Sequence, residues 1–161
     1  NSNSLDLEVP FGSTVGSQNP LYVYNNLARP SDQMLSSRLL ALSKSLNDTV
    51  RLAKFFTKPA GTFFTSFNNG STAAAPTLAT RSKYNVYLTG TTGEAPIRLL
   101  TTFQVQFILA ESALVLVTSG DPQTYYQAGI TATMLTLGMT QADIDNYFLT
   151  NPPVVTLRGT P

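Results

Sequence analysis

Apolar residues follow a helical spacing most clearly in the last third of the chain. Between residues 103 and 117 they fall at i, i+4, i+7, i+11 and i+14, on one face of a helix: Phe103, Phe107, Ala110, Leu114 and Val117. Thr101 or Thr102 offers the N-cap oxygen that begins such a helix. Four more residues extend the apolar surface nearly all round: Ile108, Leu109, Val115 and Leu116. We therefore expect this helix to be central in the fold.

A second helix follows after a very short connection. Asp121 is a good N-cap and Pro122 suits the first helical position, so the pattern predicts a helix over residues 122–137 that Gly138 terminates. The short connection requires the two helices to fold back as an antiparallel hairpin. Small residues would let their axes approach closely, as in tetratricopeptide-like helix pairs: Ala128, Gly129 and Ala132.

A third helix is expected after the hairpin. Thr140 and Asp143 have the spacing of a capping box, which predicts a helix through Phe148. The sequence Asn-Pro-Pro at residues 151–153 should end it, leaving residues 151–161 as a tail.

The first third of the chain predicts one helix behind an extended arm. Residues 1–30 contain three prolines and two glycines without sustained periodicity, with one short strand over residues 21–24. Ser31 then offers an N-cap oxygen, and apolar residues at helical spacing predict a helix over residues 32–46. Asn47 and Asp48 should close it.

The middle of the chain, residues 49–100, predicts mostly loop. Turn sequences occur at residues 58–61, 68–70 and 90–93, and residues 84–88 alternate weakly as a strand. The whole pattern indicates a mainly α fold: a tetratricopeptide-like antiparallel helix hairpin plus further helices, a long loop-rich segment and little β structure. We expect residues 1–161 to form a single domain or a fragment, divided as 1–30 arm, 31–48 helix, 49–100 loop-rich segment, 101–150 hairpin plus third helix, and 151–161 tail.

Composition excludes several kinds of chemistry. The 161 residues include no cysteine and no histidine, which excludes thiol catalysis and disulfides and removes the commonest general base and metal ligand; we expect no cofactor and no metal. A net charge of +1 disfavours nucleic acid as a partner. Charged residues make up only 12%, whereas Thr, Ser and Asn supply 47 residues, which suits a neutral polar partner such as a sugar.

The sequence predicts neither a signal peptide nor a membrane-spanning segment in these residues. The first ten residues have neither a basic run nor an apolar stretch, so no signal peptide is expected in this sequence. The most apolar stretch, residues 103–117, is too short for a membrane span and contains Glu111 and two glutamines.

Few carboxylates are candidates for a catalytic or ligand-binding role. Asp143 and Asp145 lie at i and i+2 on a helix and point apart, so we interpret them as first-turn charges. Glu111 is the sole charge in the apolar helix, and we expect a structural hydrogen bond or ion pair to another helix or to Arg98. The glycines of the 90–93 turn lack the lysine and helix of a phosphate loop, which favours a hairpin or surface loop.

Aromatic residues of the loop-rich middle are the remaining candidates. An exposed ring beside amides and hydroxyls suits a neutral sugar, whose C–H face stacks on the ring while its hydroxyls bond the polar groups. The alternative is that most of these rings pin loops to the helices. The candidate glycan-binding residues are Phe63, Phe64, Phe67, Asn68, Asn69, Tyr84 and Tyr87.

Three sequence blocks resemble one family. Residues 100–114 (LTTFQVQFILAESAL), the Gly-Asp at 120–121 and residues 125–134 (YYQAGITATM) are similar to a block of the SusD/RagB-like outer-membrane glycan-binding lipoproteins of Bacteroidetes. Weaker matches are Asn19-Pro20 before a helix that ends in SLND at residues 45–48 with Arg51 following, and the Asn-Asn-Gly turn at 68–70. Thr49 stands where that family has proline, and the family's lipidated cysteine is absent from the sequence.

The resemblance implies a role without catalysis. It implies capture of a neutral glycan at the extracellular face of the outer membrane for nutrient uptake, and delivery to a SusC-like TonB-dependent transporter. Membrane attachment would be through a lipid anchor absent from this chain. Because the blocks cover a middle-to-C-terminal part of a family member, we expect a fragment or truncated member, whose exposed apolar faces could pair in a homodimer.

Two other functions remain as alternatives. The chain could be a ligand-free helical scaffold for protein interaction. A glycoside hydrolase would need two carboxylates facing a cleft, and no motif joins any pair of the nine acidic residues.

Overall fold

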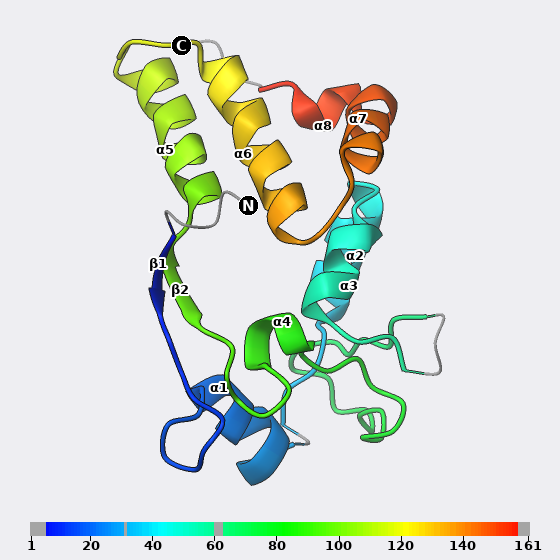
Figure 1. The fold of residues 1–161 in the computed structure, drawn as a ribbon. Helices are drawn as coiled ribbons and strands as arrows, with labels where there is room; N and C mark the ends of the chain where they lie inside the picture. Colours follow the sequence, from blue (N-terminus) through cyan, green and yellow to red (C-terminus); the bar gives the residue numbers. More distant parts are fainter. Residues whose placement is uncertain (1–5, 31, 60–62, 158–161) are drawn as a thin grey trace. The chain divides into compact units, whose positions relative to one another are not determined.

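The computed structural model describes residues 6–30, 32–59 and 63–157 (Figure 1). Within them the chain divides into two compact units. The first unit contains residues 6–8 and 98–157, and the second contains the described residues of 9–97. Helices predominate, and the only sheet in the described part of the chain has two strands, so the mainly α fold predicted from the sequence is confirmed.

The first unit is built on the antiparallel hairpin of α5 (Thr102–Val115) and α6 (Pro122–Thr136), as the sequence predicts (Figure 1). Thr101 caps α5 in a full capping box with Gln104, and the Asp121 side chain caps α6. Between the helices the chain reverses through positive φ angles at Val117 (52°) and Gly120 (106°). A β-branched residue rarely adopts such an angle, so Val117 has an uncommon backbone conformation in this turn.

The two helices of the hairpin approach closely at one glycine. A Cβ atom added to Gly129 on α6 would lie 2.7 Å from a ring carbon of Phe107 on α5. Glycine is therefore required here by the space that the Phe107 ring occupies. The role expected for a small residue at this position is confirmed.

Two further helices complete the core of the first unit. They are α7 (Gln141–Thr150), which begins with the predicted capping box of Thr140 and Asp143, and α8 (Pro152–Val155). A tail without regular structure was expected after residue 150, but residues 152–155 form α8 instead. Pro152 occupies the first position of this helix, where the missing N–H of proline costs no helical hydrogen bond. Gln123 of α6 fixes this short helix by donating to the carbonyl of Val155 at 2.8 Å. The buried core residues are Ile130, Met134, Ile144, Tyr147 and Val155.

One side of α5 packs on α6 and the other side is exposed. The expectation of a central α5 is therefore wrong. Several large aliphatic side chains of this helix and its C-terminal end are more than one third exposed: Val105, Ile108, Leu109, Val115, Leu116 and Val117. The apolar residues all round the helix had indicated burial on every side, which α6 alone cannot provide.

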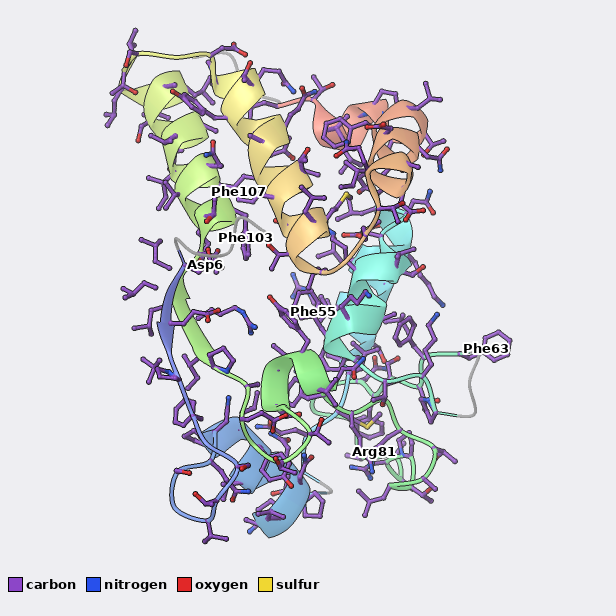
Figure 2. All side chains as sticks on the ribbon, viewed as in Figure 1. Asp6, Phe55, Phe63, Arg81, Phe103 and Phe107 are labelled. Carbon is purple, nitrogen blue, oxygen red and sulfur yellow. The ribbon has the colours of Figure 1, made fainter. Side chains whose placement is uncertain are left out.

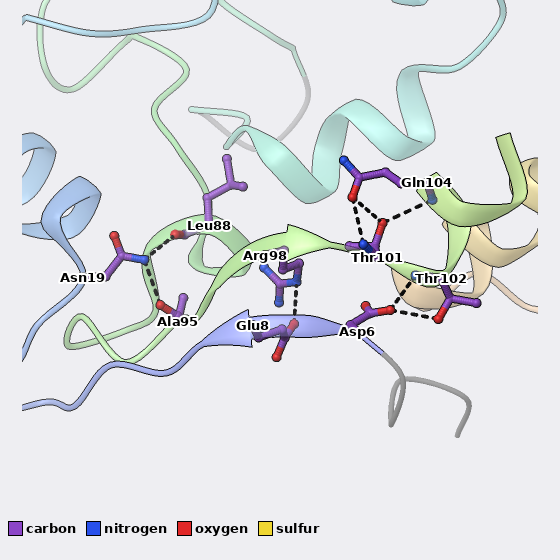
Figure 3. A network of polar contacts seen from close by, with 9 residues as sticks. All are labelled: Asp6, Glu8, Asn19, Leu88, Ala95, Arg98, Thr101, Thr102 and Gln104. Atoms are coloured by element: carbon purple, nitrogen blue, oxygen red, sulfur yellow. Dashed lines mark hydrogen bonds and ion pairs between the residues drawn. The ribbon is translucent and has the colours of Figure 1, made fainter. Parts of the chain in front are cut away.

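A short sheet precedes α5. Strands β1 (Leu7–Val9) and β2 (Ile97–Leu100) pair, and both are largely exposed. Figure 3 shows the polar contacts of this region. Arg98 forms an ion pair with Glu8 at 3.2 Å, and Asp6 accepts hydrogen bonds from the backbone N–H (2.6 Å) and hydroxyl (2.9 Å) of Thr102. The Asp6 carboxylate thereby lies at the positive end of α5.

Residues 10–19 of the second unit have no regular structure, and helix follows where a strand was expected. Helix α1 (Pro20–Tyr22) continues into the π-helix η2 (Val23–Ala28), so the strand predicted over residues 21–24 is wrong. Asn19 caps α1 by accepting from the N–H of Leu21 at 2.8 Å, and Pro20 occupies the first helical position. These two start signals outweigh the alternation that suggested a strand.

The remaining helices of the second unit are α2 (Ser37–Ser45), α3 (Thr49–Phe55) and α4 (Val86–Thr89). Helix α2 starts five residues later than predicted, because Ser36 caps it by accepting from the N–H of Leu39. Helix α3 was not expected, and α4 replaces the strand predicted over residues 84–88. Much of residues 56–85 is nevertheless without regular structure, as the sequence predicts.

Helices α2 and α3 enclose the core of the second unit. Its buried residues are Leu35, Leu40, Leu52 and Phe56, with Phe55, Phe64 and Tyr84 packed against them. Asn47 lies between the two helices with φ 53°, a left-handed conformation that asparagine tolerates well. Asp48 follows and binds Arg51 through hydrogen bonds of 2.7 and 2.6 Å from the Arg51 Nε to both carboxylate oxygens.

Asn19 ties three segments of the second unit together and is 1% exposed. Besides capping α1, its amide nitrogen donates to the carbonyl of Ala95 at 2.7 Å and to that of Leu88 at 3.4 Å (Figure 3). Its backbone N–H donates to the carbonyl of Gly93 at 2.8 Å. A single amide side chain therefore satisfies one donor and two acceptors that no helix or strand pairs.

Replacing Asn19 by alanine should destabilise the protein. The Asn19→Ala variant loses a helix cap and leaves the buried carbonyl of Ala95 without its donor, which together cost about 2 to 3 kcal/mol. Urea unfolding followed by circular dichroism measures this change. The control is Asn69→Ala, at an exposed position, which should change the free energy of unfolding by less than about 0.5 kcal/mol. Equal stability of the two variants would contradict the role of Asn19.

The contact at Gly129 predicts a pair of coupled substitutions. Gly129→Ala should destabilise the protein by about 1 to 3 kcal/mol, because the new methyl group overlaps the Phe107 ring. Adding Phe107→Leu to this variant should recover part of the loss, whereas Phe107→Leu alone should destabilise. A double-mutant cycle from thermal unfolding measures the coupling, and strictly additive effects would refute it.

Candidate functional site

The candidate loop segment, residues 63–87, is held within the second unit by hydrogen bonds at Ser82. This serine is fully buried, its N–H donates to the carbonyl of Thr65 at 3.1 Å, and its hydroxyl accepts from the N–H of Thr65 at 3.0 Å. Its carbonyl accepts from the N–H of Leu35 at 3.1 Å. One serine thus links the two sides of the loop to the residues that precede α2.

A second tie passes through Phe67. Its N–H donates to the carbonyl of Leu35 at 3.0 Å, and its carbonyl accepts from the N–H of Ser37 at 3.0 Å. The Phe67 side chain is half-buried. Phe67 is therefore held by its backbone against the start of α2.

Arg81 supports the same loop from inside. It is 6% exposed, and its guanidinium donates to the backbone carbonyls of Thr77, at 3.3 Å, and Pro76. These carbonyls belong to a turn that no strand or helix pairs. The buried cation therefore orders the turn at residues 76–81 (Figure 2).

Two predicted site residues pack against the end of α3. Tyr84 lies 5.2 Å from Phe56 between ring centroids, and Tyr87 lies 5.6 Å from Phe55 in an edge-to-face arrangement. Both tyrosines are half-buried. Tyr84 therefore pins the chain before α4, and Tyr87 pins α4 itself, to the end of α3. This is the alternative interpretation of the aromatic residues, in which the rings hold loops against helices.

The two adjacent phenylalanines differ in exposure. Phe64 is half-buried against the core of the second unit, and the Lys58 ammonium lies 5.1 Å from its ring centroid, within cation–π range. Phe63 is 78% exposed and points away from its segment (Figure 2). Of the predicted aromatic residues, Phe63 presents the most accessible ring.

Asn68 and Asn69 lie in an exposed turn. The N–H of Ser71 donates to the carbonyl of Asn68 at 3.2 Å, and Gly70 supplies the positive φ of 76° that the turn requires. Both asparagine amides are exposed. The structure thus groups Phe64 and Tyr84 at the core, places Tyr87 on Phe55, and leaves Phe63, Asn68 and Asn69 accessible.

A groove of about 440 Å³ lies between α2 and α3 in the second unit. Its walls are mainly aliphatic and aromatic, with a polar end formed by Ser43, Asp48 and Arg51; the apolar lining residues are Leu39, Leu42, Leu46, Leu52, Phe55, Phe56, Tyr84 and Leu88. The sequence reasoning missed this groove, because α3 was not predicted. The Asp48 and Arg51 pair, three residues apart, was the local signal for it.

The turn at residues 90–93 is filled by a side chain of the protein itself. Glu94 accepts hydrogen bonds from the N–H groups of Thr91 at 2.9 Å and Thr92 at 2.7 Å, and from the Thr92 hydroxyl at 3.0 Å. These bonds, the Thr91 N–H first, lower the pKa of the exposed Glu94 carboxyl to about 2. The turn is exposed, which confirms the prediction of a surface loop. Its two N–H groups bind a carboxylate of the same chain in place of a phosphate.

The other carboxylates discussed above either bind a residue of the same chain or are exposed to solvent. Glu111 is exposed, so the expectation of a buried partner is wrong, and Arg98 pairs with Glu8 instead. Asp143 accepts from the hydroxyl (2.6 Å) and N–H (3.1 Å) of Thr140, which lowers its pKa, and this confirms the first-turn role. Among the residues that the structure describes, no group of three or more acidic side chains could hold a metal ion.

Comparison with known proteins identifies one family. The model of the SusD-like family, described as starch-binding and associating with the outer membrane, matches residues 1–160. None of the curated proteins gives a significant match. In the described segments, no helix has both the length and the apolar character needed to cross a membrane.

Solved structures share the fold at low identity. A SusD homologue from Bacteroides fragilis matches with a TM-score of 0.72 and 20% identity over 98% of this chain and 39% of its own. A second SusD homologue from Bacteroides fragilis matches with a TM-score of 0.63 and 21% identity over 92% of this chain and 36% of its own. A chitin-binding protein matches with a TM-score of 0.56 and 21% identity over 73% of this chain and 30% of its own. The chain thus spans about two fifths or less of the length of these structures.

The bonding of Glu94 predicts an unusually acidic titration. Because the folded state lowers the pKa of this carboxyl, its contribution to stability is present above the ordinary pKa of 4.5 and is lost as pH falls through the folded value near 2. Carboxyl carbon shifts measured by NMR against pH should give a midpoint near 2 for Glu94. In the urea-unfolded chain the midpoint should return to about 4.5, and a folded midpoint near that value would contradict the observed hydrogen bonds.

Proposed function

Since this chain belongs to the SusD-like family of starch-binding proteins that associate with the outer membrane, we propose that it captures neutral oligosaccharide or polysaccharide without catalysis. The single observation that carries this proposal is the family match over residues 1–160, nearly the entire chain. The shared fold of the SusD homologues supports it.

The chemistry of the chain suits a neutral ligand. Charged residues make up 12% of the sequence, and hydroxyl and amide side chains are abundant. Such groups exchange hydrogen bonds with sugar hydroxyls without the desolvation cost of a charge. A starch or chitin chain, rather than an acidic polysaccharide, is therefore the expected class of glycan.

The contact region that we propose is the loop segment 63–87. Phe63 offers an exposed ring for the C–H face of a sugar, and Asn68 and Asn69 offer exposed amides for its hydroxyls. In this proposal Phe64, Phe67, Tyr84 and Tyr87 hold the loop in shape, because each is half-buried. Ser82 and Arg81 fix the loop beneath them.

Delivery and location form the finer part of the proposal. The captured glycan would pass to a SusC-like TonB-dependent transporter at the extracellular face of the outer membrane. Attachment there would use a lipid anchor. Co-purification with such a transporter from membranes, with and without the glycan, tests this step.

A ligand-free helical scaffold is the second candidate function. The exposed aliphatic residues of α5 favour it, because an apolar helix face usually contacts another protein. Binding of a transporter with no retardation by any glycan would support the scaffold and contradict the first proposal.

Affinity electrophoresis in gels containing soluble starch or glycol chitin tests glycan capture directly. The protein should be retarded by at least one of these polymers and not by an acidic polysaccharide. A migration unchanged by either neutral polymer would overturn the proposal for this chain.

Phe63→Ala tests the contact region. Loss of the stacking ring should raise the dissociation constant about tenfold, with stability unchanged because the side chain is 78% exposed. The matched control is Leu149→Ala on α7, where the side chain is also 78% exposed, and glycan binding should be unaffected. Undiminished binding by the Phe63 variant would exclude this ring from the site while leaving glycan capture itself intact.

A further inference from the structure

The turn at residues 68–71 contains the only Asn-Gly pair of the sequence, Asn69 followed by Gly70. The N–H of Ser71 closes this turn by donating to the carbonyl of Asn68 at 3.2 Å. Among the described residues, none bonds the side-chain amide of Asn69 or accepts from the N–H of Gly70. An amide carbon and the next backbone nitrogen, which can react with each other, therefore have no competing partner in this part of the chain.

Gly70 eases the approach of these two groups. Its φ is 76°, and it has no side chain that would shield its backbone nitrogen. A Cβ atom added at Gly70 would have no described atom within 4 Å beyond those of its chain neighbours, so no other segment packs against it. Asn69 and Gly70 are both exposed, so water reaches the side-chain amide.

Asn47 has the opposite arrangement, although it is also exposed. The next residue is Asp48, whose N–H donates to the carbonyl of Ser43 at 2.8 Å. This hydrogen bond and the Asp48 side chain both hinder an attack by that nitrogen. Asn68 is likewise followed by a residue with a side chain. The local structure therefore distinguishes Asn69 from these two exposed asparagines.

We propose that Asn69 is a site of spontaneous deamidation. The Gly70 nitrogen forms a bond to Cγ of Asn69, and the bond from Cγ to Nδ2 breaks. Nδ2 leaves as ammonia, with the proton that the Gly70 nitrogen gives up. Water then hydrolyses the cyclic imide. Cleavage at Cγ gives aspartate, and cleavage at the backbone carbonyl of residue 69 gives isoaspartate.

Either product changes the charge of the turn. A carboxylate replaces a neutral amide, which lowers the formal net charge of the chain from +1 to zero. In the isoaspartate product the main chain also runs through Cβ and Cγ and is longer by one atom. The hydrogen bond from Ser71 to Asn68 spans this residue, so it cannot keep its present geometry.

The proposed function gives the modification a consequence, which rests on the Asn69 amide contacting the glycan. The acidic form can be separated from the unmodified chain by ion exchange. In affinity electrophoresis the neutral polymer should retard it less than the unmodified chain, each compared with a gel that lacks the polymer. Equal retardation of the two forms would exclude this amide from the contact.

Peptide mapping of the chain aged at mildly alkaline pH tests the deamidation itself. Trypsin cleaves after Lys54 and Arg81 but not after Lys58, which precedes proline, so one peptide contains residues 55–81. Fragmentation of this peptide should place the mass difference between OH and NH2 at Asn69. Edman sequencing should stop there in the isoaspartate fraction. A peptide that keeps the Asn69 amide while other asparagines convert would overturn the proposal.

Rates of conversion separate the effect of the turn from ordinary ageing. In the folded chain the rate at Asn69 should be at least about tenfold that at Asn47. Gly70→Ala puts a methyl group beside the attacking nitrogen and should slow the conversion about tenfold or more. The matched control is Gly16→Ala, at another exposed glycine with positive φ (89°) and open space around it, which should leave the rate unchanged. Equal rates at Asn69 and Asn47, or undiminished conversion in the Gly70 variant, would overturn the proposal. These readouts involve no glycan, so they are independent of the proposed function.

Discussion

The second unit depends on one constraint: buried backbone groups in chain without regular structure still need hydrogen-bond partners. Helices and strands pair such groups automatically, but long stretches of this unit have neither. Here short polar side chains do so. Asn19 joins α1 to the carbonyls of Leu88 and Ala95, and Ser82 joins Thr65. No buried side-chain nitrogen or oxygen in the described residues lacks a partner.

This constraint changes how the composition is interpreted. The abundance of Thr, Ser and Asn first indicated a surface suited to sugars, yet several of these side chains are buried and hold the backbone: Asn19, Asn25, Ser82, Thr89, Thr101, Thr133 and Asn151. Part of the hydroxyl-rich composition therefore supports the loops. The amides of Asn68 and Asn69 are exposed, and the chain before them is ordered by the backbone hydrogen bonds of Phe67 and Ser82.

Local signals made the first unit predictable. Asp121, Pro122 and the Thr140 capping box act within one helical turn, so the sequence specified α6 and α7 correctly. Some of the errors occurred where distant residues decide. Residues before α2 pair with Ser82 instead of forming helix, and α5 lacks the second covering layer that its apolar residues indicated. The aromatic residues were identified from type alone, whereas exposure, which separates Phe63 from Phe64, depends on packing that spacing does not specify.

The close approach of α5 and α6 also has an evolutionary consequence. Because the Phe107 ring fills the space where a Cβ of residue 129 would lie, the two positions are not free to drift separately. In a descendant of this sequence, any side chain at position 129 would have to be accompanied by a smaller or differently oriented residue at position 107. We therefore expect positions 107 and 129 to covary among related sequences, although 21 residues separate them along the chain.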